Sequence, residues 1–551
     1  MSSRTQRNNK RARKERLPEV LEGLEINRTG QYVKVNDELI KRLGGQPNLE
    51  RPNPFQEHPQ FLQIVQKERA LTLDQLEEYN QALNEDFMAT KLAEMLGNFP
   101  VDFLALKRSN LVTNDWEYNV KLPVKARVSD QLHSGRCWLF AALGQIRLNI
   151  IAKHHLDNRF ELSQGYLFFY DKLERANTFL ESVWAFRDND YNSRDWLSLI
   201  QPENHMMSDG GYYSYFVNLI QKYGIVPKNV YDDGFNAKCT NGMNNVLIQV
   251  LNQMALQVNG CDWTEEEFQR QKNEWMSTIY QLVVKFLGKP PTPDSEFTWN
   301  YRDEIDNSHS KPGMTPIKFF QVVADAQLES KVLIINDPRH PETYGMSSLL
   351  AYSVNRVGGV PVNMINLPIE DFKMAICQSL QAEEAVWFAS DIGHAFDPED
   401  NTADPDRFDY ETLLGVDFNF SKADMLNSRI SAPNHALLFI GVDTIQDVEG
   451  KVTGYKKWRV ENSWGMMNLL EDDPDSGFCR FSDSYVDKYV SQAVVDMKFL
   501  PLHVLEKYLE NTNAGRCYVY DPYDAFGTVA MLGPCQHCKK LQKTFSSKLN
   551  H

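Results

Sequence analysis

The spacing of apolar residues changes once along this chain of 551 residues, from a helical period to a strand period. Thr264 and Glu267 have the spacing of a helix capping box, and Gly288 and Pro290 end the segment that they begin. Within it, apolar side chains recur on one helix face: Phe268, Trp275, Ile279, Leu282, Val283 and Phe286. Later in the chain, short apolar or alternating runs predict antiparallel strands of a sheet or open barrel, at 435–442, 456–461, 478–481 and 493–499. Helices first and strands later predict an α+β fold with two lobes.

Composition divides the chain into three parts. Residues 1–58 predict a basic, disordered arm, residues 59–510 a folded domain, and residues 511–551, rich in Gly, Pro, Tyr and Lys, an extended arm and tail. Within the domain we expect a helix over 75–96, rich in Leu, Met and Glu. The stretch from about 242 to 287 predicts an all-helical insertion.

The overall composition excludes several classes of protein. The chain is 42% hydrophobic and 24% charged, which is ordinary for a globular protein and argues against a disordered or fibrous one. No uncharged apolar run approaches the length of a membrane span, so we expect no membrane contact. The net charge of −16 argues against nucleic-acid binding through the whole surface. Eight irregularly spaced cysteines, with no apolar signal segment in Met1–Arg16, favour a reducing compartment, most simply the cytoplasm.

The first sixteen residues differ in charge from the rest of the chain. They contain seven basic residues and one acidic residue, Glu15, so their local net charge is +6. A segment of this kind cannot bury apolar surface. It fits a nuclear-import signal or a weak contact with nucleic acid, and the alternative is a solvated tail with neither role.

The segment QLHSGRCWLFAA, residues 131–142, carries the strongest chemical signal. A turn that contains Gly135 delivers Cys137 to the start of an apolar helix that extends to about Ile151. The positive end of a helix dipole and its N–H groups favour the thiolate, which is the nucleophilic form of cysteine. Gln131 could turn its amide to the same place and, with the Cys137 N–H, hold an oxyanion. The alternative is a buried structural cysteine that begins a core helix.

A thiol nucleophile needs a base, and two later segments supply one. His435 begins an apolar run, and Asn462 ends the strand-like run WRVEN at 458–462. An asparagine amide can accept a hydrogen bond from one imidazole nitrogen, which leaves the other nitrogen to face the sulfur. Trp464 can shield that bond from water. A lone histidine beside a strand is more often a core residue, but the ordered set of Gln, Cys, His and Asn favours catalysis.

These motifs resemble those of the papain-like cysteine peptidases, and more closely the bleomycin hydrolase (aminopeptidase C) branch. The likeness runs from about residue 71 to about 527, and it includes segments at 163–169, 209–211, 222–227, 297–302, 336–339 and 384–388. Ser134 and Arg136 depart from the secreted papain form, which has a cysteine and a small residue there, so the usual neighbouring disulfide cannot form. The resemblance implies a papain-like fold, with a helical lobe and a lobe like an antiparallel β-barrel. Cys137 and His435 are 298 residues apart, against about 130–150 in papain-type enzymes, which supports a helical insertion.

The resemblance also implies what each residue does. It assigns catalytic roles to four residues: Cys137 as nucleophile, His435 as acid and base, Asn462 as orienting amide and Gln131 as oxyanion donor. Asp209, Gly210 and Gly211 would lie along the cleft, where glycine backbone can pair with an extended peptide. An ordinary turn is the alternative for these three residues. Trp464 is counted with them as a substrate-binding residue, and no metal or organic cofactor is required.

Members of this branch form hexameric barrels, and their C-terminal arm lies in the cleft with its carboxylate blocking one side. Residues 520–527 resemble the end of that arm, but here the chain continues for 24 residues to His551. The carboxylate cannot take the family's position unless this tail is removed, so we expect the enzyme to trim its own tail after assembly. Cys535–Cys538, with Cys517 nearby, could be part of a metal site, although an exposed loop with redox-labile thiols is favoured.

The sequence therefore predicts a cysteine peptidase of the bleomycin hydrolase type. It would hydrolyse amide bonds of short peptides or small amides as an aminopeptidase, in a cytoplasmic homohexamer, with nuclear access through the basic arm. The alternative is a nucleic-acid-binding protein on the same fold, with peptidase activity secondary or lost. Only the basic arm favours that alternative.

Overall fold

The computed structural model of the chain describes residues 70–107, 115–124, 126–201, 205–466 and 475–527. The chain divides into two compact units, residues 1–99 and 100–551. The described helices are α3 (Leu73–Glu85), α4 (Phe87–Leu96), α5 (Val101–Ala105), α6 (Cys137–His154), α7 (Gln164–Ala185), α8 (Arg194–Ile200), α9 (Tyr213–Tyr223), α10 (Phe235–Lys238), α11 (Asn241–Val258), α12 (Glu265–Leu287), α13 (Pro316–Lys318), α14 (Ile369–Gln381), α15 (Tyr410–Leu414), α16 (Lys422–Ser428), α17 (Asp483–Tyr489) and α18 (Leu502–Asn513).

The first unit contains two helices where the sequence predicted one. α3 ends at Glu85 and α4 begins at Phe87, so the single helix expected over 75–96 is wrong. Asp86 leaves the helical conformation, and its carboxylate accepts a hydrogen bond from the Ala89 N–H at 2.9 Å. An aspartate competes well for such N-cap positions, which explains the break inside an otherwise helical pattern.

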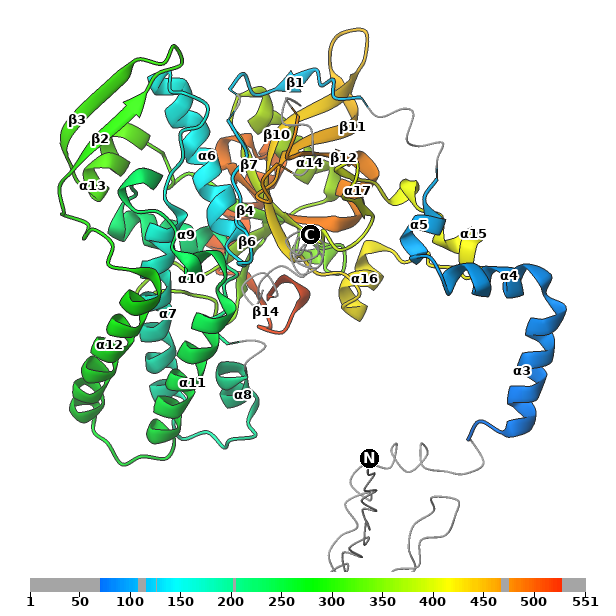
Figure 1. The fold of residues 1–551 in the computed structure, drawn as a ribbon, viewed down its shortest axis with the longest axis horizontal. Helices are drawn as coiled ribbons and strands as arrows, with labels where there is room; N and C mark the ends of the chain where they lie inside the picture. Colours follow the sequence, from blue (N-terminus) through cyan, green and yellow to red (C-terminus); the bar gives the residue numbers. More distant parts are fainter. Residues whose placement is uncertain (1–69, 108–114, 125, 202–204, 467–474, 528–551) are drawn as a thin grey trace, which may run out of the picture. The chain divides into compact units, whose positions relative to one another are not determined.

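The helical part of the second unit is built around α6, α7 and α9, with α11 and α12 alongside α7 (Figure 1). The expected insertion at 242–287 corresponds to α11 and α12. The capping box that was predicted at Thr264 and Glu267 is confirmed. Trp184 of α7 stacks on Phe268 of α12 with ring centroids 4.5 Å apart, which joins the insertion to the lobe. Among the described residues, no helix combines the length and the apolar character needed to cross a membrane.

The strands of the second unit form a large mixed sheet and a separate hairpin, β2 (Phe297–Arg302) with β3 (Ser308–Met314). The sheet has the order β14-β5-β6-β4-β13-β7-β10-β11-β12-β9-β8, with β1 beside β10. Its strands are β1 (Val120–Lys121), β4 (Lys331–Ile335), β5 (Ser347–Leu350), β6 (Asn363–Asn366), β7 (Val386–Ser390), β8 (Phe396–Asp397), β9 (Thr402–Ala403), β10 (His435–Gln446), β11 (Val452–Glu461), β12 (Phe478–Ser482), β13 (Val490–Asp496) and β14 (Cys517–Tyr520).

The four predicted strands lie at the centre of this sheet as β10 to β13, and their pairing there is antiparallel. The sheet as a whole is mixed, because β14–β5, β4–β6 and β12–β9 pair in parallel. The strand expected over 493–499 begins earlier, at Val490, and stops at Asp496, where a short 3-10 turn follows.

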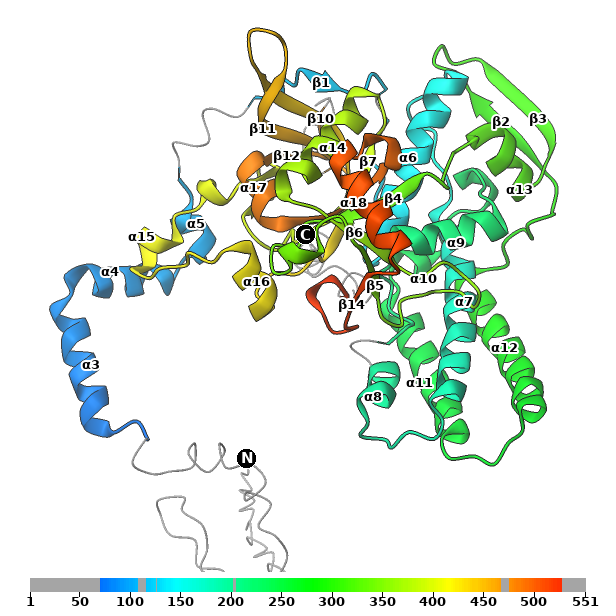
Figure 2. The same ribbon diagram turned by 180° about the vertical axis from the view of Figure 1, so that it is seen from behind.

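Alternation along β10 places helices on both faces of the sheet. Ala436 and Leu438 pack with the residues of α6, whereas Leu437 and Phe439 pack with those of α14, α17 and α18. Successive side chains of a strand point to opposite faces, so both faces of this strand are buried. In the reverse view of Figure 2, α14 and α18 lie between the viewer and the strands. The result is a layered core in which α6 lies directly against the strand that begins at His435.

Candidate active site

Cys137 is the first residue of α6, and its side chain is 2% exposed. The sulfur lies 3.9 Å from the carbonyl oxygen of Gly135, in the turn that precedes the helix. α6 is buried along almost its whole length and ends at His154, a few residues later than expected. The positive end of a helix dipole acts more strongly in such a buried setting than in water. This location is the one that the sequence predicts for an attacking thiol.

Gln131 lies in the same turn, and it is almost fully buried. Its amide nitrogen donates to the carbonyl oxygen of Ser134 at 2.6 Å, and its amide oxygen accepts from the Ser463 hydroxyl at 2.6 Å. A glutamine amide carries two N–H bonds, and the Ser134 carbonyl engages one of them. The side chain is therefore oriented within the turn that leads to Cys137, and it also touches the residue after Asn462.

His435 and Asn462 are joined by a direct hydrogen bond. His435 is the first residue of β10, Asn462 follows β11, and each is 2% exposed. The imidazole Nε2 lies 2.9 Å from Asn462 Oδ1, which also accepts from the Ser463 N–H at 2.7 Å. Because an amide oxygen only accepts, Nε2 donates and Nδ1 is the ring nitrogen available for proton transfer.

Trp464 covers this histidine. Its ring stacks on the imidazole with centroids 4.7 Å apart and an interplanar angle of 26°. The backbone around it pairs with the turn before Cys137, because Asp130 and Trp464 form an antiparallel bridge and the Gly465 N–H donates to the Ser129 carbonyl oxygen at 3.0 Å. The indole thus has the shielding position expected for it, and a contact with substrate stays a prediction.

A buried ion pair fixes α6 to the end of β11. Arg147 of α6 donates to the carboxylate of Glu461, the residue before Asn462. Burial raises the pKa of Glu461, and the neighbouring arginine opposes that shift. Near the start of α6, the indole N–H of Trp387 in β7 donates to the Trp138 carbonyl oxygen at 3.2 Å. The helix that begins at Cys137, the strand that begins at His435 and the strand that ends before Asn462 are therefore held in one rigid core.

The carboxylate of Asp209, in the segment predicted to lie along the cleft, is enclosed within the protein. The Asp209 side chain is fully buried and pairs with Lys172 of α7, with Nζ and Oδ1 3.0 Å apart. Although burial acts to raise it, the pKa of Asp209 lies below its ordinary value because Lys172 and several hydrogen-bond donors favour the carboxylate. A carboxylate enclosed in this way is occupied by its protein partners, so a substrate contact of Asp209 through its backbone stays a prediction. The backbone of Gly210 and Gly211 stays the candidate for pairing with a peptide.

Several residues that support the site were not predicted from the sequence. Ser463 connects Gln131 to the asparagine loop, Arg147 connects α6 to β11, and Lys172 neutralises the carboxylate beneath the turn. Two of them carry a signal that could have been used, because Arg147 is the only charged residue in the segment 137–152 and Lys172 closely follows the apolar run at 166–170. Charged side chains are almost never fully buried unless they are paired, so each implied a buried partner.

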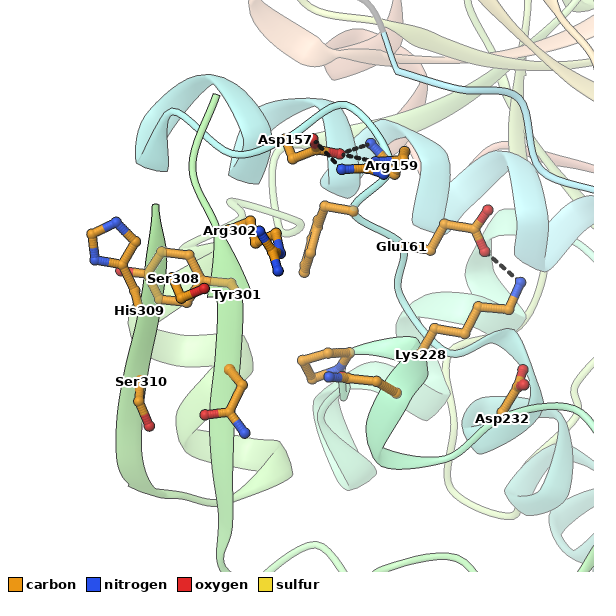
Figure 3. A pocket seen from close by; sticks show the side chains of 14 residues that line it. Asp157, Arg159, Glu161, Lys228, Asp232, Tyr301, Arg302, Ser308, His309 and Ser310 are labelled. Atoms are coloured by element: carbon orange, nitrogen blue, oxygen red, sulfur yellow. Dashed lines mark hydrogen bonds and ion pairs between the residues drawn. The ribbon is translucent and has the colours of Figure 1, made fainter. Parts of the chain in front are cut away.

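A cavity of about 810 Å³ lies elsewhere, between the β2–β3 hairpin and the segments 157–161 and 227–232 (Figure 3). Four of its charged side chains pair with one another, Asp157 with Arg159 at 2.8 Å and Glu161 with Lys228. Of the described residues that line it, none belongs to the predicted site. We assign this cavity no part in the chemistry.

No cluster of three or more His, Cys, Asp or Glu side chains suited to a metal ion occurs among the residues described by the structure. Residues 535–538 and the basic arm at 1–16 lie outside the described residues, so the expectations for them stay predictions.

A cysteine at the start of a buried helix in one lobe, with a histidine–asparagine pair on the sheet of the other, defines the papain-like class of cysteine peptidase. The profile of the peptidase C1-like family matches residues 70–527, so the chain belongs to this family. The match spans both lobes and every predicted catalytic residue.

Curated relatives and solved structures agree with that membership. Aminopeptidase C of Streptococcus thermophilus is 34% identical over 428 residues, which cover 77% of this chain and 91% of that protein. Bleomycin hydrolase of Rattus norvegicus is 33% identical over 413 residues, which cover 73% and 87%. The crystal structure of PepW from Lactobacillus rhamnosis is similar with a TM-score of 0.76 and 31% identity, over 84% of this chain and 99% of that one.

Proposed function

We propose that this protein is a cysteine aminopeptidase that hydrolyses amide bonds of short peptides and of small amides. The observation that carries the proposal is the 2.9 Å hydrogen bond between His435 Nε2 and Asn462 Oδ1, because it leaves Nδ1 to exchange a proton with Cys137. The names of the relatives, aminopeptidase C and bleomycin hydrolase, support the substrate class.

The chemistry proceeds in two stages. The Cys137 thiolate attacks the carbonyl carbon of the substrate, and the resulting oxyanion accepts hydrogen bonds from the Cys137 N–H and the Gln131 amide. The C–N bond then breaks, and the leaving amine takes from His435 the proton that the thiol gave up. In the second stage His435 takes a proton from water, whose oxygen attacks the thioester. The carboxylic acid leaves, and the proton returns to the sulfur.

The C-terminal arm supports removal of residues from the peptide N-terminus. β14 pairs with β5, and the guanidinium of Arg339 donates to both oxygens of Asp524 at 3.0 and 2.9 Å. The Tyr212 hydroxyl, next to Gly211 in sequence, donates to the Phe526 carbonyl oxygen at 2.6 Å. An arm fixed beside the glycine backbone would close one end of the substrate path, so that a free N-terminus could enter but a continuous chain could not pass.

The aminopeptidase proposal is tested with fluorogenic aminoacyl amides. The full-length enzyme should release the fluorophore from a free aminoacyl amide much faster than from the N-acetylated form of the same compound. Cys137→Ser should abolish both reactions and serves as the background control. Equal hydrolysis of free and acetylated substrates would contradict exopeptidase action, and hydrolysis that survives Cys137→Ser would contradict the nucleophile.

Removal of the 24 residues after Gly527 is a separate part of the proposal. If the enzyme trims its own tail, the purified wild type should have a lower intact mass than Cys137→Ala prepared in the same way. Identical full-length masses would refute self-processing.

Assembly as a homohexamer is proposed from the first unit. None of the residues of α3 is buried, and Leu73, Leu76, Tyr79 and Leu83 are exposed at helical spacing. An apolar helix face of this kind needs a partner, and a second copy of the chain would supply one. Light scattering should give the mass of six chains, and Leu76→Glu with Leu83→Glu should lower it. A single-chain mass for the wild type would refute the assembly.

A cytoplasmic location is proposed from the thiol chemistry, since a catalytic thiolate works best where cysteines stay reduced. Cell fractionation with antibody detection tests it, and recovery mainly in a membrane or secreted fraction would contradict it. Contact with nucleic acid through residues 1–16 stays a prediction, which a salt-dependent DNA shift lost on their deletion would support.

A further inference from the structure

The residues on either side of Cys137 in the sequence both donate hydrogen bonds to one residue, Asp209. The Gly135 N–H donates to Asp209 Oδ2 at 3.0 Å, and the Trp138 indole N–H donates to the Asp209 carbonyl oxygen at 2.7 Å. Gly135 and Trp138 flank the cysteine in sequence, so one residue fixes the backbone before it and the side chain after it. Gly211 completes the contact, because a Cβ there would lie 2.6 Å from the indole ring of Trp138.

The Asp209 carboxylate is itself held by donors on every side. Lys172 Nζ lies 3.0 Å from Oδ1, Asn244 Nδ2 donates to the same oxygen at 2.7 Å, and the Thr240 hydroxyl donates to Oδ2. Lys172 also donates to the Met207 carbonyl oxygen at 2.6 Å. Asp209, Lys172 and Thr240 are completely buried. An ion pair this enclosed is rigid, because movement of either charge would leave the other without a partner.

The turn at 131–136 contains no cysteine, so only noncovalent contacts hold it. Ser134 stands where secreted papain-like enzymes have a cysteine, so no disulfide can hold this turn. Its hydroxyl instead donates to the Gln131 carbonyl oxygen at 2.7 Å, within the turn. The link from the turn to the segment of Asp209 is made by the carboxylate.

We propose that Asp209, charge-paired with Lys172, is a positioning residue for the reaction: it sets the place of the Cys137 sulfur and N–H by holding the turn and the first residues of α6. This inference rests on the proposed peptidase function and adds to it a residue that does not touch the substrate. A displacement of about 1 Å at a reacting group can cost about 100-fold in rate, so the effect of losing this support should appear in catalysis.

The main test is Asp209→Asn in the full-length protein. One amide oxygen cannot accept from Gly135, Thr240 and Lys172 together, so the turn should relax. The matched control is Asp483→Asn, which removes one of the two carboxylates that pair with another largely buried lysine, Lys373, at 2.8 Å; the second is Asp487 at 2.7 Å. Each variant is compared with the wild type for thermal unfolding, kcat, KM and the rate of alkylation of residue 137 by iodoacetamide as a function of pH, read by peptide mapping.

We expect both variants to unfold at lower temperature. At a temperature where both are folded, Asp209→Asn should lose about 10-fold to about 100-fold in kcat with little change in KM, and its alkylation at residue 137 should slow and shift to higher pH. Asp483→Asn should retain the wild-type kcat and alkylation profile. A folded Asp209→Asn with the kinetics of the control would overturn the inference, since its effect would then be on stability alone.

A gentler variant keeps the inference testable if Asp209→Asn does not fold. Thr240→Val has nearly the same shape but no hydroxyl to donate to Asp209, and Thr240→Ser restores the donor. Thr240→Val should lower kcat and slow alkylation, and Thr240→Ser should recover both. Wild-type kcat in Thr240→Val would overturn the inference. Failure of the proposed function itself would look different, because the wild type would then hydrolyse no amide and would not be alkylated preferentially at Cys137.

Discussion

Removal of the Asn462 side chain should separate catalysis from folding most clearly. In Asn462→Ala the His435 Nε2–H loses the acceptor that now lies 2.9 Å away, and the Ser463 N–H loses its acceptor at 2.7 Å. The histidine and asparagine are both buried, and Trp464 stacks on the imidazole, so water cannot replace the amide easily. An unsatisfied buried polar group costs about 1–3 kcal/mol.

That free energy can be converted into a rate. If the imidazole is misoriented mainly in the transition state, a cost of about 1–3 kcal/mol corresponds to a loss of about fivefold to about 150-fold in kcat/KM, carried mostly by kcat. The assay is steady-state hydrolysis of an aminoacyl coumarin amide across pH 5–9 (an approximate range that spans the titration of histidine). Asn218→Ala is the control, because Asn218 is also fully buried and its amide nitrogen donates to Asn355 and to the Val360 carbonyl oxygen, both at 3.0 Å.

The two variants should lose similar stability in thermal unfolding, but only Asn462→Ala should lose activity. The reasoning is refuted if Asn462→Ala keeps kcat/KM within about twofold of the wild type, since that is below the smallest cost of an orphaned buried donor. Equal activity losses in both variants would also refute it, because the loss would then come from general destabilisation.

The remaining predictions concern stability. Glu461→Gln breaks the buried pair with Arg147 and should cost about 3–5 kcal/mol in the free energy of unfolding, measured by denaturant titration, and an unchanged midpoint would contradict the pairing. Gly211→Ala should cost about 1–3 kcal/mol, because the new Cβ would lie 2.6 Å from the ring of Trp138. Gly234→Ala should be milder, because Gly234 has a φ of −74° and a Cβ there would meet no atom within 4 Å; equal costs would contradict the close packing at Gly211. Burial lowers the pKa of His205 from 6.5 to about 4. As the pH falls below 6.5, the histidine of the unfolded chain therefore becomes protonated before that of the folded protein. The free energy of unfolding should fall by about 3 kcal/mol between pH 6.5 and about pH 4. In His205→Gln this part of the pH dependence of the free energy of unfolding should disappear. An unchanged pH dependence would show that His205 does not cause it.

The local features of the site were predictable because they depend on neighbouring residues. The glycine turn, the apolar run after it and the position of Cys137 at its first residue predict a helix start with a thiol, and the structure has that arrangement. The apolar run from His435 likewise predicts a strand that begins at the histidine. The antiparallel pairing of β10 with β11 ends at Leu438 and Glu461, which brings the start of β10 beside the end of β11 and so His435 near Asn462.

What could not be predicted depends on contacts between distant segments. The D-G-G sequence of residues 209–211 indicates a turn, but the burial of its carboxylate is decided by Lys172 and Asn244, which come from two other helices. The outer strands gave no signal, because β5 is only four residues long and begins with two serines, and its parallel partner β14 lies far along the chain. Parallel pairing of short strands is determined by the packing of the whole sheet and leaves no periodic pattern.

The central claim is that the Cys137 sulfur and the His435 imidazole meet within reach of one proton. A short bifunctional reagent, 1,3-dibromoacetone, measures this directly, since two C–Br bonds break, two bromide ions leave, and its three-carbon unit joins the sulfur to a ring nitrogen. We predict that one equivalent inactivates the enzyme and that peptide mapping finds the peptide of Cys137 linked to the peptide of His435. Alkylation of Cys137 with His435 unmodified, or a link to a different histidine, would contradict the account.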